Sequence, residues 1–138
     1  MVARVVAPCY LTFDTNVLVR FLTGDDPQQA KRALALFRDA QVWIAKTVLL
    51  ETEWVLRSLY GFESDRAAAA LQALVGLENV HVEDARAVER ALNWFAAGVD
   101  FADALHLANL DQAEAFVTFD ANFRKRAARV TGLPIRAL

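Results

Sequence analysis

Several residue types that define whole classes of protein are scarce in this sequence. Cys9 is the single cysteine among 138 residues, so an intrachain disulfide is impossible and a reducing compartment is expected. The two histidines, His81 and His106, are far apart in sequence, which argues against a zinc site. The five glycines are scattered along the chain, so no glycine-rich loop is available to hold a phosphate group.

An excess of one charge and a long apolar run are also missing. The chain has 15 basic and 17 acidic residues, a net charge of −2, so no global basic field marks it for nucleic acid. An acidic site can still mask a local basic rim. No apolar run is long enough to span a bilayer, and we expect no membrane association. The first residues lack a basic segment and a cleavage site, so we expect no signal peptide and a cytoplasmic location.

Hydrophobic residues make up 56% of the chain, enough for the core of a single domain over residues 1–138. Short β-rich runs alternate with longer helical stretches, which predicts an α/β fold with a parallel sheet flanked by helices. The predicted strands cover residues 10–13, 42–45, 80–82, 115–119 and 133–136. The predicted helices follow six capping residues, Asp14, Asp26, Thr47, Ser64, Asp84 and Asp100.

Two short segments at opposite ends of the chain nearly repeat. "LTFDTN" covers residues 11–16 and "VTFDAN" covers residues 117–122. In each, a buried strand delivers an aspartate, Asp14 or Asp120, at its carboxyl end. Functional groups of open parallel sheets gather beyond the carboxyl ends of the strands, where the strand order reverses. Neighbouring strands at that point would therefore bring the two carboxylates together.

Two further acids lie on predicted helices without an obvious local partner. Glu51 lies at the border of the apolar face of its helix, whereas Glu53 has Arg57 four residues later. Asp103 lies in the first turn of the helix that Asp100 caps, where the helix dipole favours an anion. Taken singly, each of these acids has an ordinary explanation as a cap or a solvated side chain.

Together the acids predict a metal site. Asp14, Glu51, Asp103 and Asp120 are all placed by an α/β fold near one end of one sheet. Such a cluster would repel itself unless a cation fills it. Hard cations such as Mg²⁺ take carboxylate oxygens, waters and substrate phosphate oxygens. This donor set therefore indicates metal-assisted phosphoryl transfer.

The motifs resemble those of PIN-domain ribonucleases, in particular VapC-type toxins of toxin–antitoxin pairs. The matching segments are "FDTNVLVRFLTGDDP", "VLLETEWVLRSLYG", "DFADALHLA" and "VTFDANF". The resemblance implies a five-stranded sheet of order 3-2-1-4-5 and an endoribonuclease dependent on Mg²⁺ or Mn²⁺. It also implies an antitoxin partner and a homodimer. Asp14, Glu51, Asp103 and Asp120 match the acidic set, with Asn16, Thr118 and Asp100 in support.

Basic residues near the predicted site are candidates for binding RNA. The segment "FRKRAAR" places Arg124, Lys125 and Arg126 just after Asp120. Lys46, at the end of the second predicted strand, is a further candidate. A basic run is usually a solvated face, so contact with the RNA backbone is expected of one or two of these side chains. Such contacts position a strand without reading its sequence.

Two alternative functions fit part of the pattern. A phosphatase of the haloacid-dehalogenase type also has an aspartate after its first strand. That chemistry uses a second acid two residues later, where this chain has Asn16. A non-catalytic binding module on the same fold is the other alternative, and four acids without cationic neighbours argue against it.

Overall fold

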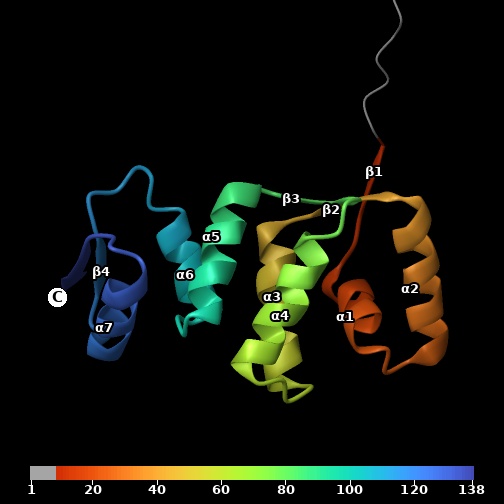
Figure 1. Cartoon of the computed structure of the whole chain (residues 1–138), viewed down its shortest axis with the longest axis horizontal. Helices are drawn as coiled ribbons and strands as arrows, with labels where there is room; N and C mark the ends of the chain where they lie inside the picture. The colour runs from red at the N-terminus through yellow and green to blue at the C-terminus, as the bar shows by residue number, and fades with distance from the viewer. Residues whose placement is uncertain (1–8) are drawn as a thin grey trace, which may run out of the picture.

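The computed structural model describes residues 9–138, which form short strands and seven helices (Figure 1). The alternation of strand and helix that the sequence predicts is confirmed. The strands are β1 (Tyr10–Thr12), β2 (Gln41–Ile44), β3 (Val80–Val82), β4 (Phe116–Thr118) and β5 (Ile135–Ala137). The helices are α1 (Thr15–Thr23), α2 (Pro27–Asp39), α3 (Lys46–Ser58), α4 (Ser64–Val75), α5 (Ala85–Ala96), α6 (Phe101–Ala108) and α7 (Ala121–Val130).

The strands form two separate parallel sheets. One has three strands in the order β1-β2-β3, and the other pairs β4 with β5. The register aligns Leu11 with Val42, Val42 with Val80, and Val117 with Arg136. The parallel α/β class, the 3-2-1 order and the 4-5 pairing are therefore confirmed.

The predicted contact between the first and fourth strands is not formed among the described residues. Figure 1 shows β1 with α1 and α2 at one end of the molecule, and β4 with α7 at the other. Helices α3 to α6 lie between them. One continuous five-stranded sheet is therefore absent from residues 9–138, and in its place each of these two strands is hydrogen-bonded on one edge only.

The core lies between the three-stranded sheet and the helices that follow it. Val42 and Ile44 of β2 are fully buried, as are Leu49 of α3 and Leu71 of α4. Phe101, at the start of α6, is also fully buried and meets Phe95 of α5 edge to face. This apolar contact fixes the first turn of α6 against α5, because aromatic pairs favour this geometry.

The predicted helix starts are mostly confirmed, but the caps differ in detail. Asp14, Asp26 and Asp100 each accept a backbone hydrogen bond from the first turn of the helix that follows, as predicted. Thr47 is not a cap, because α3 begins one residue earlier and Ala45 has the capping position. Ser64 begins α4 but likewise makes no capping bond.

Asp84 precedes α5 without a capping hydrogen bond from its side chain. Its backbone is left-handed, with φ of 50°, a conformation that aspartate tolerates better than most residues. Its carboxylate instead accepts a bond of 3.4 Å from Lys46, at the start of α3. The predicted helix start is therefore correct, but the predicted role of the side chain is wrong.

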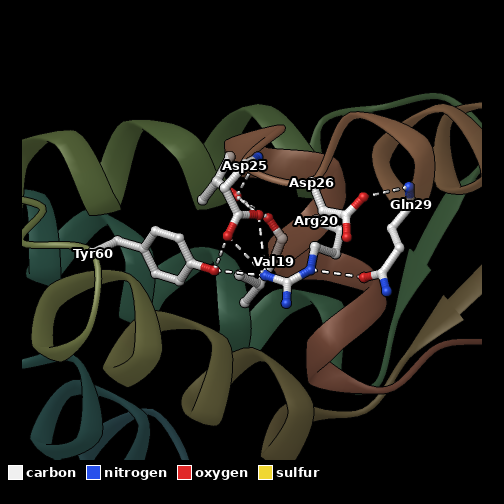
Figure 2. A network of polar contacts seen from close by, with 7 residues as sticks. Val19, Arg20, Asp25, Asp26, Gln29 and Tyr60 are labelled. Carbon is white, nitrogen blue, oxygen red and sulfur yellow. Dashed lines mark hydrogen bonds and ion pairs between the residues drawn. The ribbon is translucent and has the colours of Figure 1, made fainter.

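A polar network connects the loop between α1 and α2 to the end of α3 (Figure 2). The Arg20 guanidinium donates to both oxygens of Asp25, at 3.0 and 2.9 Å, and to the Tyr60 hydroxyl at 2.7 Å. Tyr60 in turn donates to Asp25 at 2.6 Å. The Tyr60 hydroxyl, with the other donors, lowers the pKa of Asp25. The network ties residues 35 positions apart in sequence into one charged unit.

No helix in residues 9–138 combines the length and the apolar character that crossing a bilayer requires. The expectation of no signal peptide concerns mainly residues 1–8, which lie outside the described residues.

Candidate active site

Asp103 and Asp120 lie beside the same surface pocket. This pocket, of about 230 Å³, is lined by residues from the start of α6 and the start of α7. Asp103 is in the first turn of α6 and is partly buried. Asp120 lies between β4 and α7. Its side chain accepts a hydrogen bond from the Phe123 amide at 2.9 Å, so it caps α7. The structure thus brings together two of the four acids that the sequence predicts.

The charge around Asp103 is predominantly negative. Partial burial raises the pKa of Asp103, and the nearby carboxylates of Asp100 and Asp120 raise it further, while His106 acts in the opposite direction. The two neighbouring carboxylates disfavour ionisation of Asp103 because like charges repel across a short distance. A divalent cation placed among these oxygens would relieve that repulsion.

Asp100 connects this pocket to α3. Its carboxylate accepts the Asp103 amide at 3.5 Å and the Arg57 guanidinium at 3.4 Å. Arg57 also pairs with Glu53, whose side chain is only 2% exposed. Burial raises the pKa of Glu53, against the opposing effect of Arg57. Arg57 therefore holds together the second half of α3 and the beginning of α6.

Glu51 is exposed on α3 and lines a groove adjacent to the pocket. The groove also contains Trp54 and Asp100, so Asp100 belongs to both concavities. Exposure leaves the Glu51 carboxylate accessible from solvent. The sequence places Glu51 and Glu53 at the two borders of the apolar face of α3, but the structure buries Glu53 and leaves Glu51 exposed.

Asp14 does not line the pocket that Asp103 and Asp120 share. It follows β1 and accepts the Val17 amide at 3.0 Å, which makes it the cap of α1. Because β1 and β4 belong to separate sheets, Asp14 and Asp120 do not meet within the described chain. No three acidic, histidine or cysteine side chains in residues 9–138 are close enough to hold one metal ion.

The polar residues predicted in support lie in different parts of the structure. The Thr118 hydroxyl accepts the amide of Asp120 at 3.0 Å, so it shapes the turn after β4. Asn16 lines a groove between α1 and α2 with Arg20 and Arg32. Asn122, which the sequence analysis missed, lines the pocket of Asp103. Its position in "VTFDAN" matches that of Asn16 in "LTFDTN", and this repeat was the available signal.

The candidate RNA-binding residues differ in their availability. Arg126 is exposed and lines the pocket between α6 and α7, beside Asp103. Arg124 is partly buried and Lys125 is exposed on the same helix. Lys46 donates to Asn109 at 2.9 Å and to Asp84 at 3.4 Å, so its ammonium group already has protein partners. Arg126 is therefore the best placed of the four.

Comparison with protein families matches residues 11–129 to the PIN domain. The chain belongs to the PIN-domain family. The match begins in β1 and ends in α7, so it includes all four predicted acids of this PIN domain. No curated protein matches the chain.

Two solved structures are similar to this PIN domain. One is VapC20 of Mycobacterium tuberculosis, a toxin that cleaves the sarcin–ricin loop, with 22% identity and a TM-score of 0.43 over 91% of this chain and 99% of that one. The other is VapBC2 of Rickettsia felis bound to a DNA fragment from its promoter, with 13% identity and a TM-score of 0.40 over 94% and 98%. Both scores lie below 0.5, so the assignment rests on the family match.

Proposed function

We propose that this PIN domain is a divalent-metal-dependent endoribonuclease and the toxin of a VapBC-like toxin–antitoxin pair. The observation that carries the nuclease proposal is the pocket that Asp103 and Asp120 share in a chain of this family. The toxin role is supported by the four motifs that resemble VapC toxins. The proposal includes an RNA substrate, a cognate antitoxin, a homodimer and a cytoplasmic location.

The side chains at the pocket suit Mg²⁺ or Mn²⁺. Asp103 and Asp120 offer hard oxygen ligands, and Mg²⁺ is commonly held by one or two carboxylates together with waters and substrate phosphates. Asp120 uses one oxygen as a helix cap, which leaves its second oxygen available. When bound, such an ion supplies an activated water and stabilises developing negative charge. Asp14 and Glu51 are the further ligands in this proposal.

The protein's own groups would position the RNA strand. Arg126 lies at the edge of the acidic pocket, where a guanidinium can hold a phosphate through two parallel hydrogen bonds. Asn122 lies at the same pocket and can donate to a phosphate or ribose oxygen. A cation close to the acids reduces repulsion between the site and the backbone, and thereby favours approach of the scissile phosphate.

The proposal is tested by replacing acids with asparagine. Asn is as good a helix cap as Asp, so Asp14→Asn and Asp120→Asn remove charge while keeping the capping bonds. We expect Asp14→Asn, Asp103→Asn and Asp120→Asn each to lower RNA cleavage in Mg²⁺ or Mn²⁺ by at least about 10- to 100-fold. Asp26→Asn is the matched control, because Asp26 caps α2 away from the pocket. Folded variants that cleave at the wild-type rate would refute the site.

The alternatives give different results in the same assays. RNA cleavage that a chelator abolishes is expected of the nuclease and excludes a binding module. A covalent phosphate on Asp14 would instead identify a phosphatase. For the toxin role, expression should arrest growth, and coexpression of the neighbouring gene's product should relieve the arrest. Growth unaffected by an active nuclease would reject the toxin role alone.

A further inference from the structure

Two strand edges with apolar side chains are open at opposite ends of the molecule. Within residues 9–138, β1 pairs only with β2, and β4 pairs only with β5. Tyr10 and Leu11 of β1 are 41% and 43% exposed. Val117 of β4 and Phe119 just after it are 52% and 82% exposed. Both edges thus present hydrophobic side chains to solvent.

Such edges are unusual for parallel strands. Parallel sheets are normally covered on both faces, and their strands are rich in apolar residues for that reason. A two-stranded sheet such as β4-β5 has little stability by itself, and an open apolar edge invites another strand. The side chains of β1 and β4 are therefore those of central strands that lack one neighbour.

The backbone of β4 is oriented to accept that neighbour. The Phe116 amide donates to Pro134, and the Leu138 amide donates to the Thr118 carbonyl, so these groups point toward β5. Because successive residues of a strand point their amides to alternate sides, the amides of Val117 and Phe119 point to the open edge. Another parallel strand can bind there without disturbing the pairing with β5.

We propose that two copies of this chain exchange their C-terminal units, so that β4 of each copy pairs in parallel with β1 of the other. The two open edges cannot meet within one chain arranged as in Figure 1, because α3 to α6 separate them. Reciprocal exchange satisfies both edges in both copies and closes the dimer with two-fold symmetry. Each half then has a five-stranded sheet whose last two strands come from the partner.

The exchange also brings a third acid to the site. Aligning "LTFDTN" with "VTFDAN" places Leu11 beside Val117 of the partner subunit, and Asp14 beside Asp120 of the partner subunit. Asp103 and Asp120 of one chain would then share a site with Asp14 of the other. This part rests on the proposed function, whereas the pairing of β1 with β4 does not.

Solution mass is the first test. We expect a mass of about 31 kDa, twice the 15.3 kDa of one chain. Val117→Pro, which removes an amide from the open edge of β4 but none that faces β5, should halve the mass. Val117→Lys, which places a charge on β4 beside its open edge, should also halve the mass. Val117→Thr should remain dimeric. Circular dichroism verifies that each variant is folded. A wild-type monomer, a larger polymer or a dimer unaffected by proline and lysine overturns the proposal.

Disulfide trapping tests which chains meet, and it needs no activity. In a Cys9→Ser background, one chain carries Leu11→Cys and the other Val117→Cys, and the two are refolded together. A covalent dimer is expected in the mixture and not with either variant alone. If no covalent dimer forms in the mixture, the exchange is wrong. If one chain carrying both cysteines forms only a cross-linked monomer, the strands pair within the chain and the proposal is overturned.

Complementation tests the shared site. Asp14→Asn and Asp120→Asn chains, refolded together, should recover cleavage, because in a mixed dimer one of the two sites has neither substitution. Sites within single chains would stay inactive in every mixture, which overturns the shared site. An inactive wild type with positive disulfide trapping would refute the nuclease and leave the exchange standing.

Discussion

At the scale of single residues, two glutamates two positions apart have opposite surroundings. Glu53 is buried and paired with Arg57, whereas Glu51 is exposed beside the groove. Removing Glu53 leaves the Arg57 guanidinium without its carboxylate partner. An unpaired charge is costly to bury, and the partial exposure of Arg57 reduces that cost. We expect Glu53→Ala to lower the free energy of unfolding by about 1–3 kcal/mol in urea titrations. Glu51→Ala, the matched control, should leave it within about 0.5 kcal/mol.

The sequence does not show which of these two glutamates is buried, and the reason is physical. A helical projection places both at borders of the apolar face, and the Arg57 spacing suggests an ordinary surface pair. Arg57, the partner of Glu53, also bonds Asp100 at the start of α6, so α6 packs at this side of α3. That contact lies 43 positions away in sequence and no local pattern reports it.

The Asp25 network predicts a measurable shift in titration. The Tyr60 hydroxyl is the main cause that lowers the pKa of Asp25. In Tyr60→Phe the pKa of Asp25 should rise toward 3.8, its ordinary value. Because the folded-state pKa is lowered, the stabilisation is present above the unfolded-state pKa and is lost as pH falls through the folded-state value.

NMR titration of the Asp25 carboxyl carbon measures this shift directly. Tyr10→Phe is the control, since Tyr10 lies on β1 outside the network. The stability difference between Tyr60→Phe and wild type should narrow at acid pH, where Asp25 is protonated in both. An unchanged Asp25 titration in Tyr60→Phe would show that the hydroxyl does not bind this carboxylate in solution.

At the scale of elements, α6 has the decisive position because Asp100 caps it and its first turn contains Asp103. Phe101, fully buried against Phe95, anchors that turn. We expect Phe101→Ala to cost about 3–5 kcal/mol of unfolding free energy, measured by denaturant titration. Leu59→Ala, at a 69% exposed position just after α3, is a control for truncation of a large apolar side chain. Equal costs for both variants would contradict the packing of α6.

Element boundaries follow closely from the sequence where local chemistry decides them. Asp26 followed by Pro27 predicts the start of α2, and β3 is predicted over the same residues that form it. The start of α3 is less predictable, because Ala45 and Lys46 give no capping signal and Thr47 gives a misleading one. Leu59, which has the apolar character of the α3 core positions, is 69% exposed because the helix ends at Ser58.

At the scale of the whole molecule, a metal ion should stabilise the folded protein if the proposed site exists. A ligand present at ten times its dissociation constant adds about 1.4 kcal/mol. For a chain of this size, we expect Mn²⁺ or Mg²⁺ to raise Tm by about 2–5 °C. The shift should disappear with a chelator and in Asp103→Asn, while Asp26→Asn should retain it. An equal shift in Asp103→Asn would place the ion elsewhere.

The site is predictable from sequence only in part, because half of it depends on which strands become neighbours. Asp103 and Asp120 line one pocket between α6 and α7, and their role in catalysis remains a prediction. Whether Asp14 joins them depends on the edge beside β1, which the structure leaves open in a single chain. The prediction of a four-acid site therefore remains a prediction.

Helix capping by aspartate has a genetic consequence under the proposed function. Asp14 and Asp120 serve folding through one oxygen and would serve chemistry through the other. Asparagine performs the first task and not the second, and a single-base change converts either aspartate codon into an asparagine codon. Cells that escape growth arrest could thus carry a substituted toxin that no longer cleaves RNA but still folds. Such survivors would still present the antitoxin with the surface it binds.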